Sequence, residues 1–381
     1  TITANCVSKL ASFGFKVAIS SNSHSVINNL LKKIQKILSN KENEVKIFKA
    51  ENRKEPNEEL EKLSINTMQT KKVADFISEG CIIGGTVWAL CLEELKEKFD
   101  LLVIDEAGQM SLANLMIMSG CAKSIMLVGD QQQLSHVSEA LHDSEAGLSS
   151  LEYWLSMKKV IPNNLGVFLN KSWRMHPRIT SIVSDLFYEG KLKGYENNEV
   201  NKIYWRENFI SEKKKQIPEN GVHFEVIKHK NNSQESEEET EVIAKIIDKL
   251  YGSKFEYFSD GQLEKGIINS EEIIVIAPYN RQVQRLRKKL GKKAEISTVD
   301  KFQGREAAVA IFSLTSSTGN DAPRGLNFLL EPNRLNVAIS RAKCLSIIVG
   351  SEYLLSSAVN SIDDAKLLNN ICKINSENRK A

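Results

Sequence analysis

The chain has 381 residues, of which 41% are hydrophobic and 26% are charged, and its formal net charge is +3. This composition excludes a disordered or fibrous chain, and the length suffices for two or three domains with separate cores. No apolar run reaches the ~18–20 residues of a membrane helix, so we expect no membrane partner. The six cysteines form no C-x-x-C pair, which is typical of reduced thiols, and we expect a cytoplasmic protein.

Short apolar runs rich in β-branched residues alternate with helix-like stretches along the chain. Most of these runs are continuously apolar, which is typical of parallel strands covered on both faces. The predicted strands are residues 16–21, 81–87, 101–106, 124–130, 166–170, 222–228, 272–278, 309–315 and 345–350, and the clearest predicted helices are 24–38, 280–290 and 333–342. This alternation predicts an α/β fold with doubly wound parallel sheets.

The sequence IPNNLG, residues 161–166, supplies turn residues between two such α/β halves. We therefore predict a first domain over residues 1–163 and a second over residues 164–381. A charged insertion at about 40–72 interrupts the first domain, and a polar insertion at about 205–240 interrupts the second.

Two adjacent carboxylates, Asp105 and Glu106, end the buried run LLVIDE. Such a pair is costly unless a cation meets it. Ligands bind at the carboxyl edge of parallel sheets, and in nucleotide-hydrolysing proteins an acid there holds Mg²⁺ on the β- and γ-phosphates. We predict Asp105 as the metal ligand and Glu106 as the acceptor of a proton from the attacking water. The alternative is an exposed Asp-Glu turn.

The next apolar run, SIMLVGDQQQL, ends in Gly-Asp and would lie beside the first strand. Asp130 is then a candidate cofactor-binding residue. Gln133 would bind a γ-phosphate oxygen or the attacking water, although a glutamine in a loop is uninformative on its own.

Arginines in apolar surroundings need an anionic partner, and a triphosphate suits their planar fork. Arg174 lies in KSWRMHP, and Arg334 and Arg341 lie in NRLNVAISRAK. We predict that Arg174 and Arg341 stabilise transition-state charge and that Arg334 helps to bind the cofactor. The alternative for each is a structural salt bridge.

The stretch STVDKFQGRE, residues 297–306, contributes further cofactor candidates. Gly304, after Gln303, permits close approach of the backbone to a ligand, and Glu306 would accept from a ribose hydroxyl. The basic stretch 281–293 is either a solvated helix face or an electrostatic guide for a polyanion.

Seven stretches occur in the order found in superfamily 1B helicases, which the chain resembles over about 85% of its length, from residue 19 to residue 343. They are ISSNSHSVINNLL, VIDEAGQM, LVGDQQQL, WRMHP, VIAPYNRQVQRL, STVDKFQGRE and NVAISRAK. The closer resemblance, in DEAGQMSLAN, SWRMHPRI, LFYEGKL and DAPRGLNFLL, is to the family that fuses a RecB-like nuclease domain ahead of such a helicase.

This resemblance implies two RecA-like domains of the P-loop NTPase class, with ATP and Mg²⁺ as cofactors. It also implies an ATP-dependent single-stranded nucleic-acid translocase that moves 5′→3′, acts on DNA rather than RNA, serves DNA repair and has an upstream nuclease domain as its partner. The implied nucleic-acid contacts are Ser21, Asn22, His24 and Thr86 in the first domain and Tyr279, Asn280, Thr298 and Arg324 in the second. Tyr279 or Trp88 would stack a base.

One departure concerns the phosphate cradle G-x-x-x-x-G-K-[ST], which does not occur in these 381 residues. In the family it directly precedes the helix that ITANCVSKLASFG resembles. Without its backbone N–H groups and lysine, Mg²⁺ loses its template, so we expect the isolated chain to hydrolyse ATP negligibly.

Two other functions compete with a helicase motor. One is a non-catalytic nucleic-acid-binding or scaffolding module, against which the joint retention of Asp105, Glu106, Gln133, Arg174 and Arg341 argues. The other is a different P-loop switch such as a GTPase, against which WRMHP and SRAK in this order argue.

Overall fold

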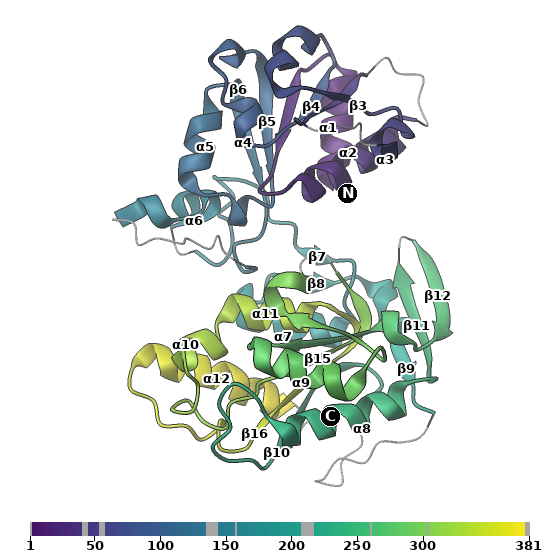
Figure 1. Ribbon diagram of the computed structural model, residues 1–381, viewed down its shortest axis with the longest axis vertical. Helices are drawn as coiled ribbons and strands as arrows, with labels where there is room; N and C mark the ends of the chain where they lie inside the picture. The colour runs from purple at the N-terminus through teal and green to yellow at the C-terminus, as the bar shows by residue number, and fades with distance from the viewer. Residues whose placement is uncertain are drawn as a thin grey trace. The chain divides into compact units, whose positions relative to one another are not determined.

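The computed structural model describes residues 2–39, 45–52, 58–134, 144–156, 158–206, 217–259, 261–302 and 305–377 (Figure 1). It divides into two compact units, Thr1–Lys158 and Lys159–Ala381, called unit 1 and unit 2 below. The candidates Gln303 and Gly304 lie outside the described residues.

Unit 1 is built on a six-stranded parallel sheet of order β3-β2-β4-β1-β5-β6. Its strands are β1 (Val17–Ser20), β2 (Ile47–Ala50), β3 (Asn66–Met68), β4 (Ile82–Gly84), β5 (Phe99–Asp105) and β6 (Ala122–Val128). Its α-helices are α1 (Ile2–Ser12), α2 (His24–Leu38), α3 (Glu58–Glu61), α4 (Val87–Leu90), α5 (Leu112–Ser119) and α6 (Ser150–Leu155). Short 3₁₀ helices are η1 (Thr70–Phe76), η2 (Glu93–Leu95), η3 (Ala107–Gln109) and η4 (Ser144–Gly147).

Helix α2 illustrates how the spacing of apolar residues in the sequence determines the packing of unit 1. Its apolar residues recur at helical spacing and are buried, and they form one core with α1 and with strands β1 and β4. The contact with β4 is tight, because a Cβ on Gly84 would lie 2.8 Å from side-chain carbons of Ile27 and Leu31. Helix α2 therefore packs closely against the sheet near the edge from which the helix starts.

Unit 2 is built on a five-stranded parallel sheet of order β10-β16-β15-β13-β14. Its strands are β10 (Gly221–Ile227), β13 (Ile273–Ala277), β14 (Glu295–Thr298), β15 (Ala307–Ser313) and β16 (Ala342–Ser351). Its helices are α7 (Pro177–Phe187), α8 (Glu237–Leu250), α9 (Asn280–Leu290), α10 (Gly325–Leu329), α11 (Pro332–Ser340) and α12 (Ile362–Glu377), with 3₁₀ helices η5 (Glu196–Val200), η6 (Ser270–Glu272) and η7 (Val299–Phe302).

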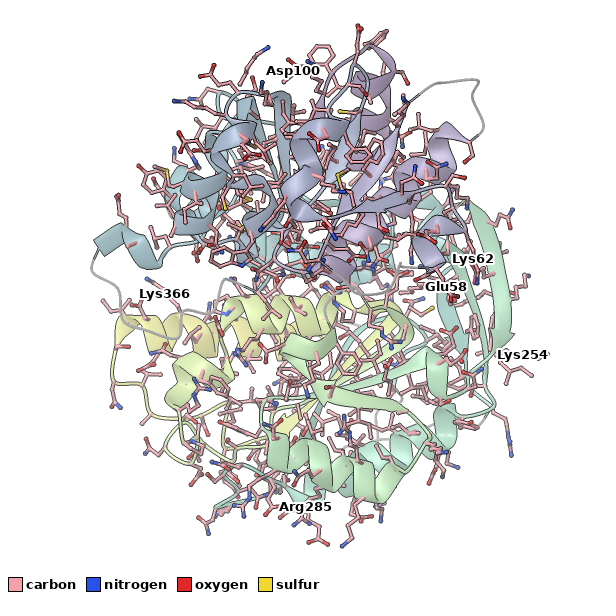
Figure 2. The ribbon with its side chains drawn as sticks, turned by 45° about the horizontal axis from the view of Figure 1, so that its top comes forward. Glu58, Lys62, Asp100, Lys254, Arg285 and Lys366 are labelled. Carbon is pink, nitrogen blue, oxygen red and sulfur yellow. The ribbon has the colours of Figure 1, made fainter. Side chains whose placement is uncertain are left out.

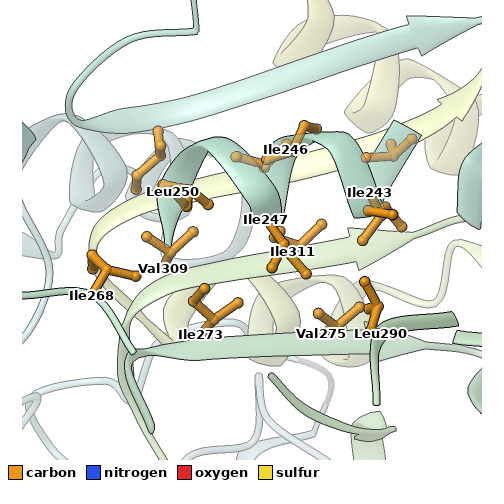
Figure 3. Packing of buried hydrophobic residues seen from close by; sticks show 14 of the residues in the cluster. Ile243, Ile246, Ile247, Leu250, Ile268, Ile273, Val275, Leu290, Val309 and Ile311 are labelled. Atoms are coloured by element: carbon orange, nitrogen blue, oxygen red, sulfur yellow. The ribbon is translucent and has the colours of Figure 1, made fainter. Parts of the chain in front are cut away.

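The core of unit 2 is a layer of branched apolar side chains between α8 and the sheet (Figure 3). Ile243 and Ile247 of α8 pack with Ile311 of β15 and Val275 of β13. Every residue of β13, β15 and β16 is buried, as continuously apolar strands require.

Two smaller sheets accompany the main sheet of unit 2. An antiparallel sheet of order β12-β11-β9 consists of β9 (Lys202–Tyr204), β11 (Lys254–Ser259) and β12 (Gln262–Ile267). The pair β7 (Lys171–Ser172) and β8 (Lys193–Gly194) is parallel.

The predicted α/β class with parallel sheets is confirmed, and both units are RecA-like α/β domains. The strand predicted at 166–170 is wrong: these residues have no regular structure, and only Lys171 and Ser172 pair. No helix in the described part of the chain is both long and apolar enough to cross a bilayer.

Candidate nucleotide and nucleic-acid site

The acidic candidates of unit 1 lie at the carboxyl ends of neighbouring strands. Asp105 ends β5, and Glu106 follows it in the left-handed region at φ 56°. A non-glycine residue in this region marks backbone strain of the kind that occurs at functional sites. Strand β6 pairs with β5 up to Val128, so Asp130 emerges at the same edge.

A backbone contact brings the loops after β5 and β6 together. A Cβ on Gly129 would lie 2.8 Å from the backbone nitrogen of Ala107, so only glycine permits this approach. Asp130 then holds its own loop, because Oδ1 accepts from Gln132 N at 2.9 Å and Oδ2 accepts from Gln133 Nε2 at 2.9 Å. The structure therefore brings Gln133 to the sheet edge that carries Asp105.

Burial raises the pKa of the Asp105 carboxyl, and a hydrogen bond from the backbone of Glu106 only partly offsets this effect. A desolvated carboxylate of this kind is stabilised by a cation. The described residues contain no cluster of three or more His, Cys, Asp or Glu with the geometry of a metal site. Mg²⁺ needs no such cluster, because it is commonly held by one or two carboxylates together with phosphate oxygens and water. Asp105 thus fits a magnesium ion that arrives with a nucleotide.

The nucleic-acid candidates of unit 1 occupy the same sheet edge, after β1 and β4. Ser21 and Asn22 follow β1, and His24 is the first residue of α2, which Ser23 caps by accepting from Val26 N. Ser21 is buried, and its hydroxyl has no hydrogen-bond partner within the described residues.

Thr86 follows β4 as the N-cap residue of α4 but makes no side-chain capping bond. Two positions further on, the Trp88 side chain is 77% exposed. Trp88 is therefore not a core residue, and its indole is accessible at the edge where base stacking was predicted.

One arginine candidate of unit 2, Arg174, shares a carboxylate with a lysine. Arg174 Nε pairs with Glu306 Oε2, and Lys343 Nζ lies 3.3 Å from Glu306 Oε1. Burial alone would raise the pKa of Glu306, but Arg174 and Lys343 together lower it below its ordinary value. Lys343 was not predicted as a site residue; its position two residues after Arg341 in SRAK was the available signal.

Arg341 is 2% exposed, at the end of α11. Its guanidinium donates to the carbonyl oxygens of Val337 at 3.3 Å and Arg305 at 3.1 Å. Two backbone carbonyls thus hold the guanidinium at the end of α11. Arg334 pairs with Glu331 at 2.7 Å and Asp300 at 3.5 Å, the salt-bridge pattern given as its alternative.

An aromatic platform lies next to Arg174 and was not predicted. Trp173 is 60% exposed, and its ring packs on Tyr195 with centroids 4.2 Å apart and an angle of 37° between the ring planes. Phe258 backs Tyr195, and Lys171 Nζ lies 5.6 Å from the Trp173 ring. A flat, supported and partly exposed ring beside a phosphate-binding candidate is suited to stacking a nucleobase.

The remaining candidates of unit 2 lie at the opposite, carboxyl edge of its sheet. Tyr279 and Asn280 follow β13, and Thr298 ends β14. Asn280 is exposed, whereas Tyr279 is buried with its ring against Phe328. Arg324 and Arg334 both lie over Phe328, at 3.9 and 4.4 Å from the ring centroid. Tyr279 therefore fits a supporting position better than a freely stacking one.

Three of the seven basic residues in the stretch 281–293 pair with acidic residues on and before α8. Arg285 binds Glu235 and Glu237, Lys289 binds Glu241, and Lys293 lies 2.6 Å from Asp248. Arg285 projects at the surface of unit 2 (Figure 2). This intramolecular ladder neutralises part of the charge that had been considered as an electrostatic guide.

Comparisons with known proteins agree with this geometry. Two family models, each described as an AAA domain, match residues 7–138 and 149–353. The DNA polymerase alpha-associated DNA helicase A of Schizosaccharomyces pombe is 30% identical over 74% of this chain and 42% of its own length. The ATP-dependent helicase upf1 of the same organism is 32% identical over 68% of this chain and 28% of its own length. Among solved structures, an arterivirus nonstructural protein 10 helicase in complex with DNA is 13% identical over 97% of this chain and 60% of its own, with a TM-score of 0.47.

The chain thus spans less than half the length of these curated relatives. Within that span, the matched models cover both units and every described candidate residue. The chain belongs to the AAA domain family and, within it, to the superfamily 1 helicases.

Proposed function

We propose that this chain is the motor portion of an ATP-dependent translocase or helicase that moves on single-stranded nucleic acid. One observation carries the proposal: the acids and amide of unit 1 follow β5 and β6, and its nucleic-acid candidates follow the adjoining strands β1 and β4 at the same sheet edge. A backbone shift at the nucleotide candidates would therefore be transmitted through neighbouring strands to the nucleic-acid candidates.

In this proposal Asp105 would hold a Mg²⁺ ion, which would stabilise negative charge on the γ-phosphate of ATP. Glu106 would accept the proton of the attacking water, and Gln133, which donates to Asp130 Oδ2, would contact the γ-phosphate. Arg174 and Arg341 supply positive charge, Glu306 accepts from the ribose, and Trp173 stacks on the base.

The exposed edge strand of unit 1 supports the proposal that a further strand with a phosphate loop completes this sheet. Among the described residues, strand β6 pairs with β5 alone, and Ile125 in its middle is 42% exposed. An apolar edge strand of this kind is usually covered by another strand. A parallel strand there would end beside Asp130, where a phosphate loop is needed. On this basis we propose that the isolated chain is a poor ATPase and that the longer protein is active.

Direction and substrate rest on resemblance alone. The proposal takes DNA as the strand, 5′→3′ as the direction, DNA repair as the process and a RecB-like nuclease domain in the same polypeptide as the partner. Among the relatives, the helicase A of S. pombe is named for DNA, whereas a Drosophila melanogaster relative is named as a regulator of nonsense transcripts 1 homolog. A comparison of ATP hydrolysis stimulated by equimolar single-stranded DNA and RNA of the same sequence will distinguish a DNA substrate from an RNA substrate.

The decisive experiment measures ATP hydrolysis by the longer protein with and without single-stranded oligonucleotide. We expect strand-stimulated turnover and a loss of about 10²- to 10⁴-fold in Glu106→Gln, the size of a general-base contribution. Glu94→Gln, which removes an exposed carboxylate from η2, is the matched control. Tight strand binding without any hydrolysis would instead favour a non-catalytic scaffolding module.

A further inference from the structure

Strand β2 buries a lysine in a place where a strand normally buries apolar groups. All four of its residues are buried, and Lys49 is fully so. Burying an ammonium group costs free energy unless other groups compensate it with charge and hydrogen bonds. A lysine retained at such a position therefore calls for specific partners.

Those partners lie at the carboxyl edge of the sheet. Lys49 Nζ lies 3.0 Å from His24 Nδ1 and donates to Ala50 O at 3.1 Å. The buried carboxylate of Glu51 lies 3.8 Å from the same His24 nitrogen. Lys49 thus connects the interior of β2 to the first residue of α2.

The contact between Lys49 and His24 determines which nitrogen of the imidazole carries the proton. When Lys49 carries its proton, its ammonium group has donors only, and His24 Nδ1 is then the acceptor. In the neutral ring the proton then resides on Nε2, and Nε2–H is a donor.

The surroundings of His24 suit a phosphodiester oxygen. The His24 side chain is 48% exposed, at the start of a 15-residue helix whose N-terminal N–H groups favour anions. The buried Ser21 hydroxyl, with no partner among the described residues, lies at the end of the strand that leads into this helix. These groups are donors, as a phosphate requires.

We propose that Lys49 is a positioning residue for nucleic-acid binding. It fixes His24 in the tautomer that presents Nε2–H to a backbone phosphate of the bound strand. The inference rests on the proposed function for its ligand, but the tautomer itself can be observed without any ligand.

The first test is the tautomer. Long-range ¹H–¹⁵N spectra of histidine-labelled protein at pH 7.5, with the His24 signals assigned from His24→Gln, distinguish Nε2–H from Nδ1–H. We expect Nε2–H in the wild type, a mixture in Lys49→Met, and no change in the control Lys46→Met, which removes an exposed charge next to the same strand. An Nδ1–H ring in the wild type, or an unchanged ring in Lys49→Met, would overturn the assignment.

The second test is affinity for a fluorescein-labelled 15-mer of oligothymidylate and for its oligouridylate counterpart. We expect Lys49→Met and His24→Leu to weaken binding about five- to tenfold, the loss of one charge-assisted hydrogen bond. His24→Gln, whose amide can accept from Lys49 and donate from Nε2, should stay within about twofold of the wild type.

These outcomes separate the two proposals. Wild-type binding that Lys49→Met leaves unchanged, relative to Lys46→Met, overturns the role of Lys49 and leaves the proposed function standing. Failure of the wild type to bind either strand overturns both. Equal losses in His24→Gln and His24→Leu would show that Nε2–H is not the group that matters.

Discussion

Lys343 Nζ lies 3.3 Å from Glu306 Oε1 and 3.9 Å from the centroid of the Tyr257 ring. Tyr257 belongs to β11, so this lysine joins the small antiparallel sheet to the amino ends of β15 and β16. The side-chain amide of Asn201 strengthens the junction by donating to the carbonyl oxygens of Arg174 and Lys343, both at 3.2 Å. The small sheet is thus part of the frame that holds the Arg174–Glu306 pair.

We expect Lys343→Met to weaken this frame. Without the ammonium, Glu306 keeps only Arg174 as a cation, so its pKa should rise toward its ordinary value and the stability of unit 2 should fall at neutral pH. Lys343 and Glu306 should show a coupling energy of ~1 kcal/mol in a double-mutant cycle of urea unfolding. Lys228→Met, at an exposed lysine 3.8 Å from Glu352, is the matched control with a coupling near zero. Equal coupling in both pairs would contradict the assigned role of Lys343.

His176 predicts a pH dependence of stability. It caps α7 by accepting from Arg178 N through Nδ1 at 3.0 Å, and burial, with the nearby Arg178 charge, lowers its pKa to about 4. The neutral ring is therefore favoured in the folded state, while the unfolded chain binds a proton below about pH 6.5. The free energy of unfolding should therefore fall as pH drops from about 6.5 to about 4, and His176 alone should account for a loss approaching ~3 kcal/mol.

The measurement is urea unfolding at several pH values between 4 and 7.5. His176→Asn retains a capping acceptor without a titrating ring, so its stability should change less across this window. Parallel pH profiles for the two proteins would show that other groups dominate.

The elements that periodicity predicted well are those in which burial and local pattern agree. Helix α2 begins and ends at the predicted residues because a continuous apolar stripe and a serine cap specify the same segment. Strands β9, β11 and β12 were missed, because the predicted strands were mostly continuously apolar runs, whereas these three strands are partly exposed. Residues 166–170 were predicted as a strand because GVFLN is apolar, but among the described residues the pairing with β8 begins only at Lys171.

The candidate site shows a similar limit. Strand ends could be located from the sequence, so the shared edge of Asp105 and Asp130 was predictable. The partners of long cations were not, because they depend on tertiary contacts between distant residues. Glu306 was considered only for a ribose, although it binds Arg174, which is 132 residues away. Likewise, the acidic partners of α9 could not be identified from its basic sequence alone.

Trp173 provides a test of base stacking that does not depend on hydrolysis. Replacement by alanine removes the exposed ring of the platform and should weaken binding of a fluorescent ATP analogue about 5- to 100-fold, within the ~1–3 kcal/mol of an aromatic stack on a base. Trp173→Phe should retain most of the affinity. Trp154→Ala, at an exposed tryptophan of unit 1, is the control. Equal losses in the two alanine variants would argue against a specific platform.

The burial of Asp105 at the end of β5 predicts that removing its charge stabilises the protein but impairs magnesium binding. Burial raises the pKa of Asp105, so the folded protein without a cation pays for keeping this carboxylate ionised at neutral pH. Asp105→Asn removes the charge at similar size, so its Tm without Mg²⁺ should rise by about 2–4 °C. The same change should abolish any increase in Tm on addition of Mg²⁺ with nucleotide, because the oxygen that binds the ion has lost its charge. Differential scanning calorimetry of both proteins, with Asp75→Asn as a control, provides the measurement. If Asp105→Asn is less stable than the wild type without Mg²⁺, the carboxylate is already compensated within the fold, and its assignment as a magnesium ligand fails.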